Sequence, residues 1–229
     1  MTTDSTSKRY ARNKASISVA DQERLARSRV LVVGAGGLGS HVLEGLTRLG
    51  VGRISICDPD VIEASNLNRQ LLALETTIGR AKVELACARA ALVNSEVEVR
   101  AFQEAFPSAQ LDAELAAADL AIDCLDSVES RRVLEARCQA MGVSLVYGSI
   151  AGSYIYFGVS AAENPLVREQ ATGDTSLEKE LGNPYPTVSI AAGLELELAL
   201  KVLLGRSVAK QGFYVFDLTD FSLDFIDLL

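Results

Sequence analysis

Four glycines stand between a short apolar run and an amphipathic stretch, at a spacing typical of a turn that binds phosphate. They are Gly34, Gly36, Gly37 and Gly39. In such a motif the first glycine allows a tight turn, the second lets the backbone approach a phosphate, and the last lets helix and strand pack closely. The start of the helix offers free N–H groups to an anion. The motif predicts a nucleotide-binding site, with a purely structural glycine turn as the alternative.

Two acidic residues follow the next apolar run along the chain. Asp58 comes directly after residues 53–57, and Asp60 lies two positions further on. A carboxylate about 20 residues past the glycines, at the end of the second strand, can accept hydrogen bonds from ribose hydroxyls. We therefore predict that Asp58 binds ribose. Asp60 is a second candidate for nucleotide binding, and a loop-capping carboxylate is its alternative role.

Polar and basic side chains beyond this carboxylate favour a polyphosphate ligand. They are Asn66, Arg69, Gln70 and Lys82. Arginine can grip two phosphate oxygens, and lysine acts as a point charge. The rival is an NAD-dependent oxidoreductase, which often needs a histidine acid or base. The sole histidine, His41, lies in the stretch after the glycines, where packing or surface exposure is expected. Stabilisation by NAD rather than ATP would favour the rival.

A third group of polar residues follows the apolar run 120–124. Ligands of open α/β sheets bind beyond the carboxyl ends of the strands, and Mg²⁺ prefers one or two carboxylates together with phosphate oxygens. We predict Asp126 as the Mg²⁺ ligand, because Asp123 belongs to the end of the strand and is expected to be buried. Arg131 is expected near the start of the next helix as a surface residue.

Alternating strands and helices would bring these residues together. Strands are expected at 29–33, 53–57, 97–101, 120–124 and 144–147, and helices at 20–26, 40–49, 80–93, 111–118 and 128–141. A strand, a glycine loop, a helix and a second strand form a βαβ unit of a parallel sheet. The predicted fold class is therefore α/β, with a Rossmann-like, doubly wound, mostly parallel sheet.

The pattern changes after Gly148. Residues 152–160 follow the preceding strand with no room for a helix, so an antiparallel strand is expected. A helix is expected at 187–204 and a closing strand pair at 213–216 and 221–225, which adds antiparallel strands at the C-terminal end. The predicted organisation is an N-terminal arm, 1–17, and a single ATP-binding domain, 18–229, in which 161–183 form a flexible crossover loop.

Composition narrows the classes of function. The 229 residues carry a formal net charge of −8, so no nucleic-acid partner is expected. The four cysteines have no paired spacing, which indicates neither disulfides nor a zinc site and makes buried thiols the expectation. The first residues are polar and lack the apolar segment of a signal peptide. No apolar run approaches the roughly 20 residues that cross a membrane. A cytoplasmic enzyme with no membrane partner is predicted.

Six motifs occur in order between Arg9 and about Phe225. They are Arg9-Tyr-Ala-Arg12, Gly34-Ala-Gly-Gly-Leu-Gly39, Asp58-Pro-Asp60, Ser65-Asn-Leu-Asn-Arg-Gln70, Gly79-Arg-Ala-Lys82 and Asp123-Cys-Leu-Asp-Ser127. Together they resemble the ThiF/MoeB/HesA family of ubiquitin-activating-type, sulfur-carrier-protein adenylyltransferases. The resemblance implies that ATP and Mg²⁺ are bound. It also implies adenylation of the C-terminal glycine of a small ubiquitin-like carrier protein with a Gly-Gly tail, with release of pyrophosphate.

The resemblance also implies roles for individual residues. Asp58 would hold the ribose of ATP, and the phosphates would be bound by Asn66, Arg69 and Lys82, with Gln70 nearby.

Two further roles follow from the same resemblance. Asp126 would coordinate Mg²⁺ and support attack of the carrier carboxylate on the α-phosphate. Arg12 would reach into the site of a neighbouring protomer, so that the enzyme would be a homodimer with two composite sites.

The sequence departs from the family pattern in two respects. It has no pair of CxxC motifs, so no zinc is predicted, and residues 161–183 contain no cysteine for a covalent carrier intermediate. Without a cysteine for covalent transfer, adenylation of the carrier is the activity that the resemblance still implies. Two rivals stay open within this fold. One is adenylation of a carboxylate on a modified tRNA nucleoside, which a salt-dependent tRNA shift would favour. The other is a non-enzymatic activating-type scaffold, which absence of ATP–pyrophosphate exchange would favour.

Overall fold

Five short strands form the parallel half of one sheet. They are β1 (Arg29–Val33), β2 (Arg53–Cys57), β3 (Glu98–Phe102), β4 (Leu120–Asp123) and β5 (Leu145–Ala151), in the order β3-β2-β1-β4-β5. β1 pairs with β2 on one side and with β4 on the other. The chain therefore winds outward in both directions from β1. The crevice where this order reverses is the usual ligand site of such sheets.

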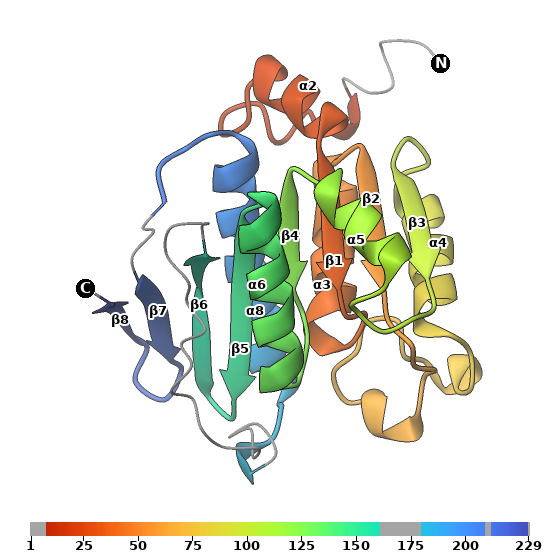
Figure 1. The fold of residues 1–229 in the computed structure, drawn as a ribbon, viewed down its shortest axis with the longest axis vertical. Helices are drawn as coiled ribbons and strands as arrows, with labels where there is room; N and C mark the ends of the chain where they lie inside the picture. Colours follow the sequence, from red (N-terminus) through yellow and green to blue (C-terminus); the bar gives the residue numbers. More distant parts are fainter. Residues whose placement is uncertain (1–7, 161–179, 209–211, 229) are drawn as a thin grey trace.

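Three antiparallel strands extend the sheet beyond β5. They are β6 (Tyr154–Ser160), β7 (Gly212–Asp217) and β8 (Ser222–Asp227), and each pairs with the one before it. The tight turn from β5 into β6 leaves no room for a crossover helix, so the new strand must run antiparallel. The predicted fold class is confirmed: a doubly wound, mostly parallel sheet carries antiparallel strands at its C-terminal end (Figure 1).

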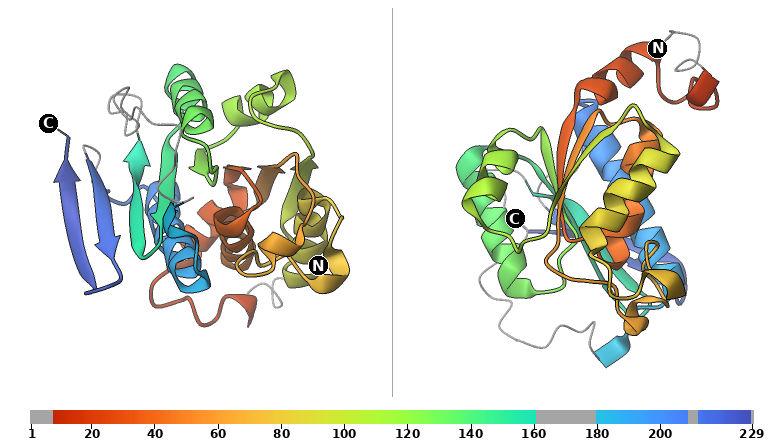
Figure 2. Two further views of the ribbon diagram at one scale, coloured as in Figure 1. Left: turned by 90° about the horizontal axis from the view of Figure 1, so that it is seen from below. Right: turned by 90° about the vertical axis from the view of Figure 1, so that its right-hand side faces the viewer.

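Helices cover both faces of the sheet (Figure 2). One core joins the sheet to α3 (Gly37–Leu49), α4 (Lys82–Val93) and α8 (Tyr185–Leu203). The other core lies under α5 (Ala109–Ala116) and α6 (Val128–Met141). Neighbouring strand residues alternate between these cores. Val32 belongs to the first and Val33 to the second, because successive side chains of a strand point to opposite faces.

One further helix precedes the sheet in the described part of the chain. Helix α2 (Val19–Arg27) begins at Ser18, whose side chain accepts a hydrogen bond from the N–H of Asp21. The end of α2 lies against the amino end of β2, where Gly52 and Arg53 donate to the carbonyls of Leu25 and Ser28. Figure 1 shows α2 at one end of the sheet, away from the carboxyl ends of β1, β4 and β5.

The structure describes residues 8–160, 180–208 and 212–228. Most of the predicted loop 161–183, and residues 1–7 of the predicted arm, lie outside the described residues. The observed bounds equal the predicted ones for β1, β2 and α6, whereas the helix after the glycines begins at Gly37 rather than at residue 40. None of the helices in the described ranges is both long and apolar enough to cross a membrane.

Candidate functional site

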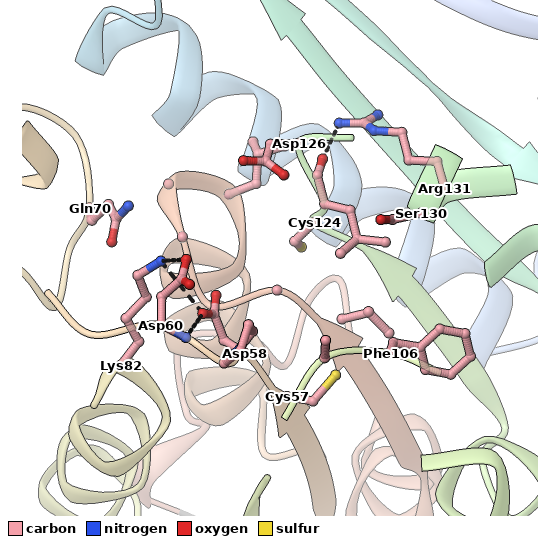
Figure 3. A pocket seen from close by; sticks show the side chains of 18 of the residues that line it. Cys57, Asp58, Asp60, Gln70, Lys82, Phe106, Cys124, Asp126, Ser130 and Arg131 are labelled. Atoms are coloured by element: carbon pink, nitrogen blue, oxygen red, sulfur yellow. Dashed lines mark hydrogen bonds and ion pairs between the residues drawn. The ribbon is translucent and has the colours of Figure 1, made fainter. Parts of the chain in front are cut away.

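A cavity of about 320 Å³ opens at the carboxyl ends of β1, β2 and β4, where the strand order reverses. Strand register aligns the three strand ends, since Val33 pairs with both Cys57 and Asp123. The residues that follow each strand therefore meet at one edge of the sheet. Nine of the predicted site residues line this cavity, several of which are labelled in Figure 3. They are Gly34, Gly36, Gly37, Asp58, Asp60, Arg69, Gln70, Lys82 and Asp126.

Two positions of the glycine loop, Gly36 and Gly39, require glycine for different structural reasons. A Cβ on Gly36 would point into the cavity, and its nearest neighbour would be Gln70 Nε2 at 3.7 Å. The backbone at this position is therefore open to a ligand. A Cβ on Gly39 would lie 1.9 Å from the Gly34 carbonyl oxygen. Gly39 does not line the cavity, and its role is the close packing of α3 on the glycine loop.

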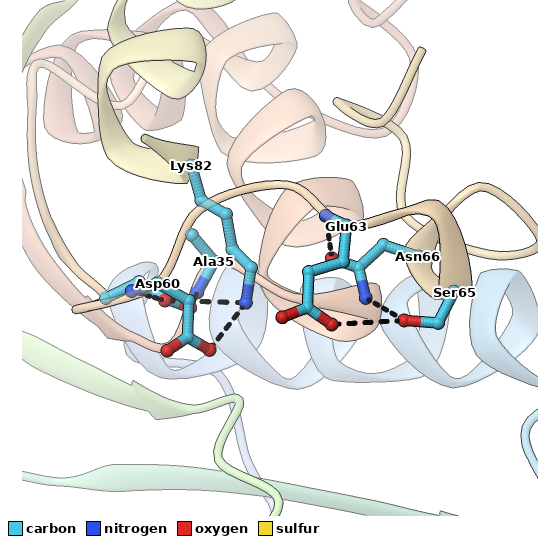
Figure 4. A network of polar contacts seen from close by, with 7 residues as sticks. Ala35, Asp60, Glu63, Ser65, Asn66 and Lys82 are labelled. Atoms are coloured by element: carbon cyan, nitrogen blue, oxygen red, sulfur yellow. Dashed lines mark hydrogen bonds and ion pairs between the residues drawn. The ribbon is translucent and has the colours of Figure 1, made fainter. Parts of the chain in front are cut away.

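Asp58, labelled in Figure 3, is the centre of a polar network at the end of β2, and its partners Ala35, Asp60 and Lys82 are labelled in Figure 4. Its Oδ2 accepts a hydrogen bond from the Ala35 N–H at 2.7 Å, and its Oδ1 accepts from the Asp60 N–H at 2.9 Å. Lys82 Nζ lies 3.5 Å from Asp58 Oδ1 and 2.9 Å from Asp60 Oδ2. The Asp58 carboxylate is thus fixed in orientation, and the lysine ammonium is buried between two carboxylates at the cavity wall.

Arg69 and Gln70 line the wall beside Lys82. Arg69 Nη1 donates to the Ser65 carbonyl at 3.2 Å and to Asn68 Oδ1 at 3.0 Å, which holds the guanidinium near the cavity. Gln70 is buried, and its Oε1 has no hydrogen-bond partner among the described residues. A buried acceptor or amide without a partner is costly, so this side chain is suited to meet a ligand.

Asn66 takes no part in lining the cavity. It is buried in the turn η1 (Ala64–Asn66), where its Oδ1 accepts from the Glu63 N–H at 3.0 Å and its Nδ2 donates to Ser65 Oγ at 3.4 Å. Both ends of the amide are therefore engaged in shaping the turn. A phosphate contact from Asn66 stays a prediction.

Asp126 and Asp123 differ sharply in environment. Asp126 is exposed at the cavity wall formed after β4, apart from the Asp58 network (Figure 3). Asp123 is buried, and its Oδ1 accepts from the Leu125 N–H at 2.9 Å. Burial raises the pKa of Asp123, while the nearby Arg131 guanidinium opposes that rise. Of the two carboxylates, only Asp126 is accessible to an ion held in the cavity.

The donor set fits Mg²⁺ bound together with a nucleotide. The described residues contain no group of three or more His, Cys, Asp or Glu side chains that could hold a metal ion. Mg²⁺ does not need such a cage, because it commonly takes one or two carboxylates and completes its shell with phosphate oxygens and water. Asp126 could supply that carboxylate.

Arg131 corrects the interpretation from the sequence. It is 5% exposed and lines the cavity from the first turns of α6, so its expected place on the surface is wrong. Its Nη1 donates to the Gly148 carbonyl at 2.9 Å, and its Nη2 donates to the Leu125 carbonyl. Leu134 and Cys138 follow Arg131 by three and seven positions, which places all three on one helical face, and this spacing is a signal that could have indicated an inward side chain.

Glu104 and Phe106 also line the cavity and were missed. They follow β3, the strand beside β2. The rule that ligands bind beyond the carboxyl ends of strands would have pointed to this loop.

All four cysteine thiols are weakly acidic. Burial raises the pKa of Cys57 and Cys138 to about 12, and it also raises the pKa of Cys124 and Cys87. Three of the four are buried, and Cys87 is half-buried. Thiolate is the nucleophilic form, so these side chains are poor candidates for a covalent intermediate.

Arg12 lies far from the cavity of its own chain. Its neighbour Arg9 donates to the Val93 carbonyl at the end of α4, and Tyr10 Oη accepts from Asn94 at 2.9 Å. Helix α4 begins at the cavity with Lys82, and its 12 residues span about 18 Å at 1.5 Å per residue. Within one protomer, Arg12 and the other predicted site residues therefore stand at opposite ends of the sheet.

Comparison with known proteins gives a consistent result. The model of the ThiF family matches residues 10–228. The chain is 35% identical over 197 residues to the molybdopterin-synthase adenylyltransferase of Escherichia coli, covering 83% of this chain and 79% of the relative. It is 36% identical over 129 residues to the SAMP-activating enzyme E1 of Haloferax volcanii, covering 56% of this chain and 48% of that relative. It is 32% identical over 136 residues to the sulfur carrier protein ThiS adenylyltransferase of Escherichia coli, covering 59% and 54%.

Solved structures share the fold at lower identity. The crystal structure of PaaA has a TM-score of 0.83 and 20% identity, covering 100% of this chain and 84% of the other. Escherichia coli MccB with ATP has a TM-score of 0.78 and 21% identity, covering 96% and 71%.

Proposed function

Because the chain belongs to the ThiF family, we propose that it is an adenylyltransferase for the C-terminal glycine of a small ubiquitin-like carrier protein with a Gly-Gly tail. Two of the relatives named above are, by their names, adenylyltransferases of molybdopterin synthase and of the sulfur carrier protein ThiS. The observation that carries the proposal is the cavity at the strand-order reversal. It joins the fixed carboxylate of Asp58, the cationic side chains of Lys82 and Arg69, and the accessible carboxylate of Asp126.

The reaction would be one displacement at phosphorus. A carboxylate oxygen of the carrier attacks the α-phosphorus of ATP, and the bond from that phosphorus to the oxygen bridging to the β-phosphate breaks. The products are a carrier acyl-adenylate and pyrophosphate. No proton transfer is needed, since the attacking carboxylate is already ionised. Such reactions depend mainly on positioning and on stabilising negative charge.

The residues of the cavity divide these tasks. Asp58, held by two backbone N–H groups, would bind the ribose hydroxyls, and the glycine loop at the start of α3 would receive phosphate oxygens. Lys82 and Arg69 would neutralise the triphosphate. Lys82 Nζ can turn from the exposed carboxylate of Asp60 toward an incoming phosphate, because Asp60 is itself free to move into water.

Gln70 and Asn66 would complete the nucleotide contacts. Gln70 has an unpartnered buried oxygen at the cavity, whereas Asn66 would have to give up a bond in its turn.

Asp126 would hold Mg²⁺, which would neutralise phosphate charge and draw the α-phosphate toward attack. We propose no zinc site. We also propose a homodimer, because Arg12 could meet a cavity of this kind only in a neighbouring chain. An acidic net charge of −8 supports the absence of a nucleic-acid partner. A single domain from residue 18 and a cytoplasmic location stay predictions.

Pyrophosphate exchange into ATP tests the function. The chain is mixed with ATP, Mg²⁺, labelled pyrophosphate and a ubiquitin-like protein that ends in Gly-Gly. Asp126→Ala should abolish the exchange and leave the melting temperature unchanged, because the side chain is exposed. Glu129→Ala is the matched control, since Glu129 is an exposed acidic residue three positions away and outside the cavity lining. Exchange at the wild-type rate in Asp126→Ala would defeat the assignment.

A further inference from the structure

The loop between β4 and α6 presents Asp126, and bonds on both sides of this residue hold the loop. The Cys124 N–H donates to the Val33 carbonyl at 2.9 Å, and the Leu125 N–H donates to Asp123 Oδ1 at 2.9 Å. On the other side, Ser127 is the N-cap of α6, and its Oγ accepts from the Ser130 N–H at 3.3 Å. The backbone on either side of Asp126 therefore has little freedom.

One buried guanidinium ties this loop to the rest of the sheet. Arg131 donates to the carbonyl of Leu125, the residue directly before Asp126, and to the carbonyl of Gly148 in β5 at 2.9 Å. Its Nη1 also lies 3.9 Å from Asp123 Oδ2. The guanidinium carbon stands 5.3 Å from the centre of the Tyr147 ring, which belongs to β5 as well.

The planar fork of arginine is required for this arrangement. Arginine presents several N–H donors in fixed directions, so one side chain can bridge two carbonyls. Lysine would bring the same charge but only a compact ammonium on a flexible stem. Hydrogen bonds from a charged donor are worth about twice neutral ones, and burial protects them from water.

We propose that Arg131 is a positioning residue that fixes Asp126 for metal binding by holding the Leu125 carbonyl against β5. The proposal rests on the function proposed above for Asp126. Arg131 cannot be a metal ligand itself, because a guanidinium has no free lone pair at neutral pH. It acts through the loop, as residues behind a metal ligand commonly do, and loss of such residues typically lowers metal affinity about 10- to 100-fold.

The test compares Arg131→Lys with the double variant Arg131→Met and Asp123→Asn. The first keeps the buried positive charge, and the second removes both members of the pair so that Asp123 is not left charged without Arg131. The control is Arg89→Lys, since Arg89 makes a two-pronged contact with Glu44 away from the cavity. Amide hydrogen exchange of residues 124–127 is measured on the chain alone. Calorimetry then measures ATP binding with EDTA and with increasing Mg²⁺.

In both Arg131 variants, the amide hydrogens of residues 124–127 should exchange at least about tenfold faster than in wild type. The Mg²⁺ concentration that gives the same gain in ATP affinity should be about tenfold higher or more. ATP binding in EDTA and the Arg89→Lys control should match wild type. Wild-type loop exchange and Mg²⁺ requirement in either folded variant would overturn the proposal. Global unfolding of both variants would also overturn it, because Arg131 would then be a core residue. Failure of the wild-type chain to bind ATP with Mg²⁺ would instead refute the proposed function. The hydrogen exchange of the loop amides would still test whether Arg131 holds the loop between β4 and α6.

Discussion

Replacement of Gly36 and of Gly39 by alanine separates two roles inside one motif. At Gly39 the new Cβ would lie 1.9 Å from the Gly34 carbonyl oxygen and 3.3 Å from Cys124 Cβ. Both neighbours belong to the close contact between α3 and the strand ends, so α3 must shift. At Gly36 the new Cβ would have only Gln70 Nε2 nearby, at 3.7 Å, which is ordinary van der Waals contact.

The expected magnitudes differ accordingly. Overpacking of this kind costs about 1–3 kcal/mol, and a domain of this size loses about 2–4 °C of melting temperature per kcal/mol. Gly39→Ala should therefore melt about 2–12 °C below wild type. Gly36→Ala should melt close to wild type, but its methyl group would occupy the space of a phosphate. A steric cost of the same size, about 1–3 kcal/mol, would reduce the free energy of ATP binding and weaken the affinity about 5- to 150-fold.

Two assays read the two effects. Thermal denaturation without nucleotide measures stability, and calorimetry with ATP and Mg²⁺ measures affinity at a temperature where both variants are folded. The reasoning is refuted if Gly36→Ala binds ATP as wild type does, since the cavity beside Gly36 would then not receive the phosphates. A Gly39→Ala variant as stable as wild type would refute the packing role.

Three further predictions concern charge. Lys82→Ala should weaken ATP binding about 10- to 150-fold, the equivalent of about 1.5–3 kcal/mol for a hydrogen bond to a charged group. Lys201→Ala is the control and should bind ATP as wild type does, because Lys201 pairs with Glu197 on α8 and does not line the cavity. Equal ATP affinities of the two variants in calorimetry would contradict the prediction. Burial raises the pKa of Glu195 well above 4.5, so the folded chain keeps a proton that the unfolded chain releases. The free energy of unfolding therefore falls as the pH rises from about 4.5 through the folded pKa. Glu195→Gln should remove that loss, so its melting temperature should gain on wild type between pH 5 and pH 8, and a constant difference across this range would count against the buried proton. Arg12→Ala and Asp126→Ala chains, each inactive alone, should recover pyrophosphate exchange when mixed, because one composite site per mixed dimer is intact; no recovery would argue against sharing of sites between protomers.

Local patterns were enough to predict most of the frame. β1 and β2 are short β-branched runs with breaks at both ends, and α6 runs between the N-cap Ser127 and Gly142, so their bounds follow from neighbouring residues. The carboxyl end of a strand is equally local, which is why Asp58 could be assigned to the site. The start of α3 was set too late, because glycines lower helix propensity and here they form the first turn.

The remaining features depend on partners distant in the sequence. Arg131 has the charge typical of a surface residue, and its acceptor Gly148 and its counter-charge Asp123 lie on strands of the sheet. Asn66 is a residue type that can bind phosphate, but its side-chain amide is hydrogen-bonded to Glu63 and Ser65. The role proposed for Arg12 depends on a second chain, which a single sequence does not describe.

Direct detection of the adenylated carrier tests the central claim. The chain, ATP with Mg²⁺ and a ubiquitin-like protein ending in Gly-Gly are mixed, and the carrier is weighed intact by mass spectrometry while pyrophosphate is assayed. We expect the carrier to gain one adenylate group, with one pyrophosphate released for each, and a carrier that lacks its last glycine to gain none. An unmodified carrier, or ATP converted to ADP and phosphate, would contradict the account.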